Sequence, residues 1–311
     1  MNFTCYKIIL KSEEKVILPY YSGFAFRGLL GNALKKLYCI LKSSKKECKD
    51  CILVDKCIYA YIFESPALNK ENGLLKGIIT LPHPFILMPE GFGIHFKRKG
   101  SKKSVYLTLF GKVQDYLPYI VYAFTNMGEI GITKKRGKFR IAQIKQFVGL
   151  KKSKIIYSNQ NENKIYPDKF KFDFEFFKRL KAKDKIVMRT LTPIRIKKQG
   201  KFIKNNINLM DILLSLKRRV TALSYYYCNK EFKFPLIEDL IKDVETNLIF
   251  EKWLELSRFS TRQQTKMKMG GLMFEMEISG DLSKLYPYLK LAEFVHIGKN
   301  ASFGLGKILV N

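Results

Sequence analysis

A glycine-rich basic loop near the C-terminus, residues 295–307, carries one of the three histidines of the chain. Glycine lacks a Cβ, so its main-chain N–H group can approach an anion closely and can adopt the positive φ values that direct several N–H groups at one ligand. This pattern indicates a loop that binds a phosphate backbone, although two glycines before a strand also make an ordinary turn. The predicted phosphate-binding residues of the loop are Gly298, Lys299, Gly304, Gly306 and Lys307.

Basic residues recur along the whole chain, whose 57 lysines and arginines against 27 acidic residues give a net charge of +30. Such an excess favours a polyanionic partner, and nucleic acid is the simplest one. A lysine-rich proteome is the alternative source of the charge. Alternation over residues 257–268 predicts a basic β-hairpin with its four cations on one face, while a solvated edge hairpin is the alternative. The basic residues assigned to RNA are Arg27, Lys134, Lys135, Arg136, Arg195, Arg258, Arg262, Lys266 and Lys268.

Four cysteines crowd into residues 39–57, and four thiolates can close a tetrahedral structural zinc site. The spacing of the last three also suits an iron–sulfur cluster, so zinc is favoured and not established. Reduced surface thiols are the third alternative. The predicted ligands, in an insertion at about residues 39–64, are Cys39, Cys48, Cys51 and Cys57.

His296 is the candidate for proton transfer, because RNA cleavage without a metal needs a group that titrates near neutral pH and cations that hold the phosphorane charge. Lys299 lies three residues away, and Tyr21 precedes the first predicted helix and could donate or orient a proton. The alternative for His296 is a buried structural histidine. His83, between two prolines, is interpreted as a packing residue, and His95 as a surface residue.

Hydrophobic periodicity predicts two copies of a β-α-β-β-α-β order. Each half ends in an apolar helix, a Gly-x5-Gly loop with basic residues and a strand, which indicates internal duplication. The expected fold is α+β, with tandem ferredoxin-like (RRM-like) domains and a cysteine-rich insertion in the first. The expected boundaries are residues 1–150, a polar linker at 151–170, and 171–311 with the glycine-rich loop. The predicted helices span residues 22–41, 113–128, 209–227 and 282–294.

Composition excludes several classes of protein. A hydrophobic content of 47% supports sizeable cores, and no stretch reaches the ~18 apolar residues of a membrane span. No secretory leader is visible, so a cytoplasmic protein without a membrane partner is expected. The chain shows no Walker loop and no Ser/His/Asp arrangement, which argues against phosphoryl transfer from a nucleotide.

The chain resembles the CRISPR-associated endoribonucleases that process precursor guide RNA, within the group of RAMP proteins. The resemblance rests on residues 24–31, on the cysteine cluster running into residues 59–64, on residues 192–195, on residues 260–263 with 270–272, and on residues 296–299 through 303–306. It implies binding of a CRISPR repeat RNA and metal-independent general acid–base cleavage to 2′,3′-cyclic phosphate and 5′-hydroxyl ends, with no cofactor for catalysis.

The same resemblance bears on the site and the partners. Many relatives carry a catalytic histidine on or near the first helix, but residues 20–41 contain none, so His296 is the best remaining position. A non-catalytic RAMP subunit of a CRISPR effector complex is the main alternative, which would add other effector subunits as partners. A general single-strand binder or metal-dependent regulator is a more distant one. A monomer or a homodimer is expected.

Overall fold

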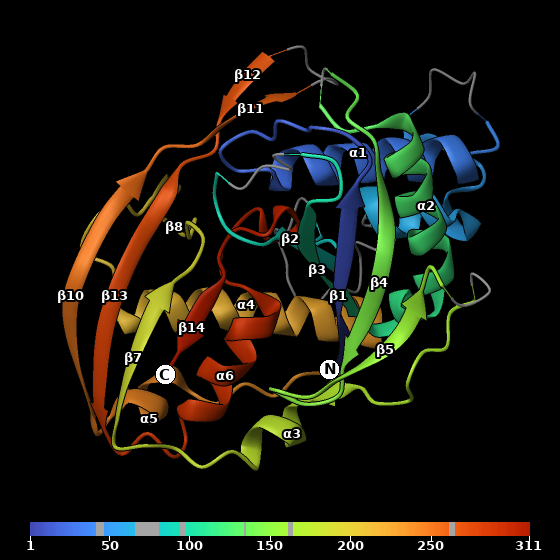
Figure 1. The fold of residues 1–311 in the computed structure, drawn as a ribbon. Coiled ribbons are helices and arrows are strands. Elements are labelled where there is room, and N and C mark those ends of the chain that lie inside the picture. Colours follow the sequence, from blue (N-terminus) through green and yellow to red (C-terminus); the bar gives the residue numbers. More distant parts are fainter. Residues whose placement is uncertain (42–46, 66–80, 94–97, 134, 161–163, 261–264) are drawn as a thin grey trace. The chain divides into compact units, whose positions relative to one another are not determined.

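The computed structural model describes residues 1–41, 47–65, 81–93, 98–133, 135–160, 164–260 and 265–311 (Figure 1). The chain divides into two compact units. The N-terminal unit comprises residues 2–172 and 226–228, and the C-terminal unit comprises Met1 with residues 173–225 and 229–311.

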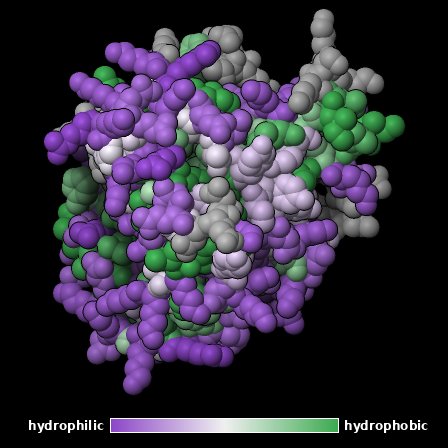
Figure 2. Space-filling model, turned by 45° about the vertical axis from the view of Figure 1, so that its right-hand side comes forward, coloured by the Kyte–Doolittle hydropathy of each residue, from purple (hydrophilic) through white to green (hydrophobic). Residues whose placement is uncertain are grey.

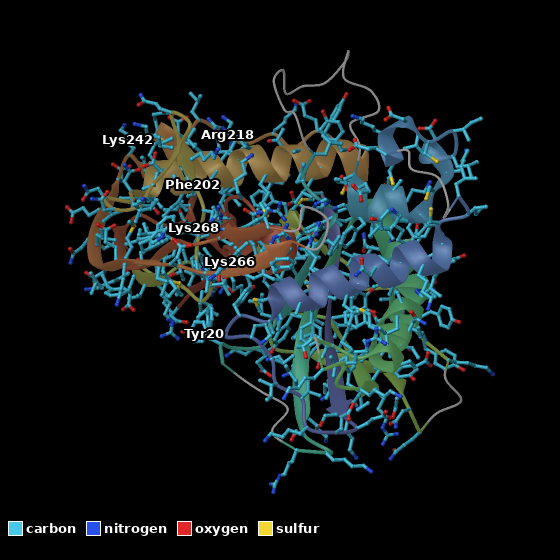
Figure 3. All side chains as sticks on the ribbon, turned by 90° about the horizontal axis from the view of Figure 1, so that it is seen from above. Tyr20, Phe202, Arg218, Lys242, Lys266 and Lys268 are labelled. Carbon is cyan, nitrogen blue, oxygen red and sulfur yellow. The ribbon has the colours of Figure 1, made fainter. Side chains whose placement is uncertain are left out.

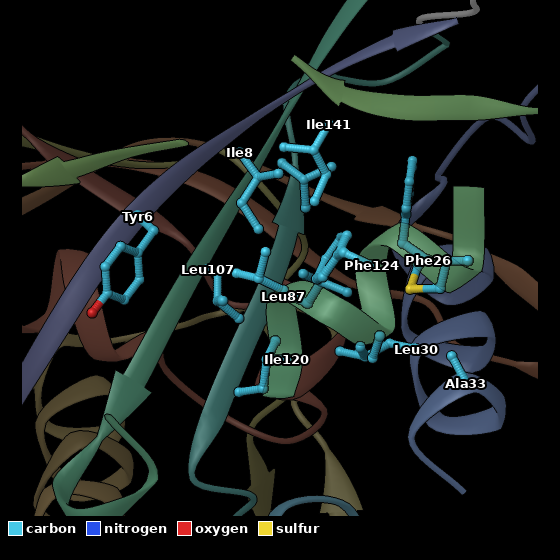
Figure 4. Packing of buried hydrophobic residues seen from close by; sticks show 14 of the residues in the cluster. Tyr6, Ile8, Phe26, Leu30, Ala33, Leu87, Leu107, Ile120, Phe124 and Ile141 are labelled. Atoms are coloured by element: carbon cyan, nitrogen blue, oxygen red, sulfur yellow. The ribbon is translucent and has the colours of Figure 1, made fainter. Parts of the chain in front are cut away.

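The N-terminal unit is an antiparallel sheet in the order β2-β3-β1-β4-β5, with a short strand β6 beside β1. Its helices bury apolar side chains at helical spacing, including Phe26 and Leu30 of the first and Ile120 and Phe124 of the second (Figure 4). The elements are β1 Asn2–Ser12, α1 Gly23–Tyr38, β2 Phe85–Pro89, β3 Lys102–Phe110, α2 Leu117–Ile130, β4 Phe139–Phe147, β5 Ser153–Ser158 and β6 Phe172–Asp173.

The cysteine-rich insertion follows α1 and consists of short helical turns. The last turn, η3, is a π-helix, in which each hydrogen bond joins residues five positions apart. It ends at Ser65, which has a left-handed backbone with a φ of 46°. The turns are η1 Cys48–Asp50, η2 Val54–Lys56 and η3 Ala60–Glu64, and a further turn, η4 Gly111–Tyr116, precedes α2.

The predicted linker at 151–170 is wrong, because residues 153–158 form β5 and pair with β4. This strand lies at the edge of the sheet and buries only the Ile156 side chain. Since a strand that covers little apolar surface has no need for alternating hydrophobic residues, its composition resembles that of a linker.

The C-terminal unit is a four-stranded antiparallel sheet in the order β10-β13-β7-β14. Buried and partly exposed residues alternate along β13, so one sheet face is covered, and α4 and α6 lie beside this sheet (Figure 1). The main elements are β7 Lys185–Thr190, α4 Leu209–Cys228, β10 Val244–Leu254, β13 Gly271–Gly280, α6 Tyr286–Val295 and β14 Ile308–Val310. The smaller elements are α3 Phe174–Lys178, β8 Lys197–Lys198, β9 Lys201–Phe202, α5 Ile237–Ile241, β11 Ser257–Ser260, β12 Thr265–Lys268 and η5 Ala301–Phe303.

The two units share one topology. Counting the main strands of each unit along the chain, both sheets run second, third, first, fourth, as β2-β3-β1-β4 and β10-β13-β7-β14. Both units also place a helix after the first strand and another after the third. This arrangement confirms the predicted tandem ferredoxin-like fold. Over the part of the chain that the structure describes, no helix combines the length and the apolar character needed to cross a bilayer.

Lys103 lies on the core-facing side of β3, where its side chain is 3% exposed and its Nζ donates to the Glu90 carbonyl at 3.1 Å. Burial lowers the pKa of this ammonium from 10.5 to about 8, against the opposing effect of the Glu90 carboxylate. The folded protein therefore binds fewer protons here than the unfolded chain between pH 8 and 10.5, so the free energy of unfolding rises with pH in that window.

We expect Lys103→Met to raise the free energy of unfolding at pH 7 by about 1 to 3 kcal/mol, because it removes the buried charge and keeps a side chain of nearly the same shape. The gain should shrink as the pH rises from 8 to 10.5. Urea unfolding of both proteins at pH 7 and pH 10 measures it, with the exposed neighbour replaced in Lys102→Met as the control. A gain that does not depend on pH would contradict the argument.

Candidate functional site

The glycine-rich loop turns tightly and uses its own N–H groups. The Gly306 N–H donates to the Pro193 carbonyl at 2.9 Å. The Lys299 N–H donates to the Arg195 carbonyl at 2.8 Å, and the Gly304 N–H donates to the Ala301 carbonyl at 2.7 Å. Gly304 and Gly306 are buried. These three N–H groups bond to carbonyl oxygens of the chain, so Lys299, Gly304 and Gly306 do not present them to a phosphate. Positive φ values occur at His296, Gly298, Asn300, Gly304 and Gly306.

His296 faces the interior of the C-terminal unit. Its side chain is 3% exposed, and its Nδ1 lies 3.0 Å from the Leu305 carbonyl oxygen, an arrangement that assigns the proton to Nδ1. Burial lowers the pKa of His296 well below its ordinary value, and Lys307 adds to this effect. Lys299, by contrast, is exposed. The structure therefore separates the two predicted partners and gives His296 the surroundings of a structural residue.

Tyr21 is also enclosed, in the N-terminal unit. Its side chain is 3% exposed, and its ring centroid lies 5.1 Å from Phe24 and 5.3 Å from Phe92. Burial raises the pKa of the Tyr21 hydroxyl. These contacts favour a packing role over the predicted proton donor.

Two cations assigned to RNA point inward instead. Arg195 is buried, donates to the Gly270 carbonyl and lies 4.3 Å above the Phe202 ring, and burial lowers its pKa. Lys307 donates to the Glu293 carbonyl at 2.5 Å. Arg195 therefore connects the β8–β9 hairpin to the start of β13. Because it lies in a basic segment of the sequence, this structural role could not be told from RNA binding by composition.

The predicted basic hairpin is confirmed as β11–β12, but its cations do not share one face. Arg258 pairs with Met267, whereas Phe259 pairs with Lys266, so Arg258 points away from the face that bears Lys266 and Lys268. Arg258 lies 4.8 Å above the Phe303 ring, and burial lowers its pKa. Arg262 lies outside the described residues.

One face of β11–β12 is basic and aromatic. Phe259 is 61% exposed beside the exposed Lys266 and Lys268. The β8–β9 hairpin adds lysines around Phe202, with Lys197 Nζ 5.1 Å from that ring. Arg195 joins the β8–β9 hairpin to Gly270, just before β13, and Figure 3 labels Phe202, Lys266 and Lys268 in the C-terminal unit. We call this the hairpin surface, composed of Lys197, Lys201, Phe202, Phe259, Lys266 and Lys268. Hydrophilic side chains also cover most of the face in Figure 2.

The N-terminal unit brings Arg27 of α1 to His83, which precedes β2. Arg27 Nη2 lies 2.8 Å from His83 Nε2, and Ser65 Oγ lies 3.2 Å from His83 Nδ1. The Arg27 guanidinium also lies 4.2 Å above the Phe63 ring. We call these four residues the His83 cluster. Sequence reasoning interpreted His83 as a packing residue, and no spacing signal links it to Arg27 because 56 positions separate them.

Among the remaining predicted residues, Lys135 and Arg136 are exposed on a loop that an Ile132–Gly137 bridge closes. Lys134 lies outside the described residues. Gly298 is partly exposed.

The four cysteines are partly exposed free thiols. Burial raises the pKa of the Cys48 thiol, and so do Glu64 and the nearby Cys57 and Cys39 thiols. Within the described ranges, no three histidine, cysteine or acidic side chains are arranged to hold a metal ion. The zinc site therefore stays a prediction.

The fold and the hairpin surface define the chain as a tandem ferredoxin-like protein with a surface suited to a polyanion. Residues 188–308 match the family model described as CRISPR-associated endoribonuclease Cas6, and residues 1–170 match one described as an N-terminal domain. The C-terminal part of the chain is therefore similar to the CRISPR-associated endoribonucleases.

Individual proteins are similar to the chain over most of its length. An uncharacterized protein of Archaeoglobus fulgidus is 25% identical over 290 residues, which cover 93% of this chain and 91% of that one. Among solved structures, a Cas6 product complex aligns with a TM-score of 0.57 at 16% identity, covering 99% of both chains. Thermus thermophilus Cas6 aligns with a TM-score of 0.53 at 14% identity, covering 99% of this chain and 98% of its own. At these identities the structural likeness is one of fold.

Proposed function

We propose that the protein binds CRISPR repeat RNA and cleaves the precursor into guide RNAs. Cleavage proceeds without a metal, by attack of a 2′-hydroxyl on the adjacent phosphate, and leaves 2′,3′-cyclic phosphate and 5′-hydroxyl ends. The match of residues 188–308 to the Cas6 endoribonuclease model and the fold similarity to a Cas6 product complex support the proposal.

The hairpin surface is the observation that carries RNA binding. An exposed aromatic ring lets a base stack at a gain of about 1–3 kcal/mol, and flanking lysines attract the phosphates on either side. Phe259 lies opposite Lys266 and on the same face as Lys268, so one strand pair supplies this combination. The lysines alone would be expected of a solvated edge hairpin, but an exposed phenylalanine would not.

The test is incubation of the purified protein in EDTA with a labelled RNA that carries the CRISPR repeat of the source genome. We expect one cut in the repeat, and no cut when the scissile nucleotide is 2′-deoxy, because the attacking oxygen is then absent. Binding without cutting under every condition would reject the enzyme.

A non-catalytic RNA-binding subunit of a CRISPR effector complex is the second candidate. The burial of His296 favours it, because the histidine chosen from the sequence does not face solvent. A solved partial Cas6-RT-Cas1–Cas2 complex aligns over 100% of this chain and 46% of that chain, at 11% identity with a TM-score of 0.57. We therefore propose CRISPR proteins as further partners, which co-purification would test.

We also propose that the cysteine-rich insertion binds a structural zinc ion. Cys39 and Cys57 raise the pKa of the Cys48 thiol, which supports this, since a cation would stabilise thiolates that repel one another. We expect about one zinc per chain by mass spectrometry of metals, and a fall in melting temperature after chelation. A metal-free protein with an unchanged melting temperature would contradict the proposal.

A further inference from the structure

We infer that His83 is the general base of the cleavage reaction and that Arg27 is the cation that stabilises the reacting phosphate. The inference rests on the proposed function and assigns its catalytic residues. It replaces the assignment to His296, and it stands on the hydrogen-bond geometry of the His83 cluster.

The cluster holds the imidazole from both sides. Nε2 faces the Arg27 guanidinium at 2.8 Å, and Nδ1 faces the Ser65 hydroxyl at 3.2 Å. Ser65 is buried at the end of η3, where its left-handed backbone turns the chain. His83 itself is partly exposed, in contrast to His296. Of the histidines that the structure describes, His83 alone has a partly exposed ring beside a cation.

An aromatic ring supports the Arg27 side chain. Its guanidinium lies above the Phe63 ring, and Phe63 in turn packs against α1 where a Cβ at Gly31 would overlap the ring. Glycine at position 31 therefore lets the aromatic ring approach the helix and support the guanidinium. Such support reduces the entropy lost when the guanidinium binds a phosphate.

The bonds define the protonation state. A guanidinium carries only donors, so Nε2 must accept the Arg27 bond through its lone pair. The imidazole is therefore neutral, with its proton on Nδ1, where the Ser65 oxygen can accept it. Ser65 Oγ can donate in turn to the Tyr61 carbonyl, 3.4 Å away. A neutral imidazole oriented in this way is ready to take up a proton at Nε2.

The two residues become reactive together when RNA binds. A phosphate accepts hydrogen bonds from a guanidinium more strongly than a neutral imidazole does, because the phosphate is charged. The incoming phosphate therefore attracts Arg27 away from Nε2 and leaves the lone pair directed at the same phosphodiester. The Nε2 lone pair of His83 therefore stays hydrogen-bonded to Arg27 until RNA binds.

The reaction balances without a co-reactant. The 2′-hydroxyl proton moves to Nε2, the 2′ oxygen forms a bond to phosphorus, and the bond from phosphorus to the 5′ oxygen breaks. The imidazolium releases its proton to bulk water, and the leaving 5′ oxygen takes up a proton from bulk water. Arg27 holds the extra negative charge on the phosphorane oxygens in between.

Single-turnover cleavage of the labelled repeat RNA in EDTA tests the inference with two substitutions of His83. We expect His83→Ala to lower the cleavage rate about 10²- to 10⁴-fold with little change in RNA affinity, and added imidazole to restore part of it. We expect a similar loss for His83→Gln, because glutamine can accept from Arg27 and donate to Ser65 but cannot take up the proton. Arg27→Ala should lower the rate about 10²-fold or more.

The matched control is His296→Gln, the same substitution at the buried histidine. It should keep the cleavage rate per folded molecule while lowering the melting temperature. Near-normal cleavage by His83→Gln would overturn the inference, since His83 would then only position Arg27. Loss of cleavage in folded His296→Gln with a normal rate in His83→Gln would return the role to His296. If the wild-type protein cuts nothing, the proposed function fails and the inference fails with it.

Discussion

Replacement of Gly306 by alanine is expected to lower the free energy of unfolding of the C-terminal unit by about 3 to 5 kcal/mol. Gly306 has a φ of 77°, which disfavours any residue with a Cβ. A Cβ built there would also overlap the Ile297 carbonyl oxygen. The backbone segments at Gly306 and Ile297 are both fixed by hydrogen bonds. The Ile297 N–H donates to the Gly306 carbonyl, and the Gly306 N–H donates to the Pro193 carbonyl, both at 2.9 Å.

Gly200→Ala separates the two causes of that loss. Gly200 also has a left-handed φ, of 81°, but an added Cβ would meet nothing within 4 Å. We therefore expect only the conformational cost, about 1 kcal/mol. Urea unfolding of both variants and the wild-type protein measures the difference. Equal losses in both variants would show that the loop around Gly306 can yield, in contrast to the packing described above.

The triple substitution Phe259→Ala, Lys266→Ala and Lys268→Ala is expected to weaken RNA binding about 10²- to 10³-fold at moderate salt. The phenylalanine contributes stacking, which does not depend on salt, whereas each lysine that contacts a phosphate contributes about 0.7 to the slope of log affinity against log salt for a single strand. The two lysine substitutions should therefore reduce that slope by about 1.4. Phe259→Ala alone should weaken binding and leave the slope unchanged.

Lys185→Ala is the matched control, because it removes an exposed lysine from the same unit. Lys185 lies on β7 and pairs with Glu277 at 2.9 Å, away from the hairpin surface. Fluorescence titration of the repeat RNA between 50 and 300 mM salt compares the variants. If Lys185→Ala changes the slope as much as Lys266→Ala and Lys268→Ala together, the charge of the chain binds RNA without a defined surface.

Much of the fold could be predicted, because each helix and most strands bury one face and so repeat their apolar residues at a fixed period. The helix predicted at 209–227 is α4, Leu209–Cys228, and the helix predicted at 282–294 is α6, Tyr286–Val295. The edge strand β5 was missed for the converse reason, since it buries little. The matching ends of the two halves predicted the duplication that both sheet orders show.

The candidate site was much less accessible from the sequence. Arg195, Arg258 and Lys307 are basic and lie in basic segments, yet the structure packs their charged groups against Phe202, Phe303 and Phe294. The aromatic partner of Arg258 is 45 positions away. Composition reports the charge of a side chain but not the direction in which it points.

The amino-acid sequence by itself determined the class of the fold, the duplication, the charge that suits a polyanion and the position of the basic hairpin, because these depend on local period and on composition. Tertiary structure decided which histidine meets a cation and which one is enclosed. His83 and Arg27 meet because the order β2-β3-β1-β4 and the packing of α1 bring together residues 56 positions apart. His296 is enclosed because the loop after α6 folds back on itself through Leu305 and Gly306. Contacts of this range depend on the completed core, and no local pattern in the chain records them.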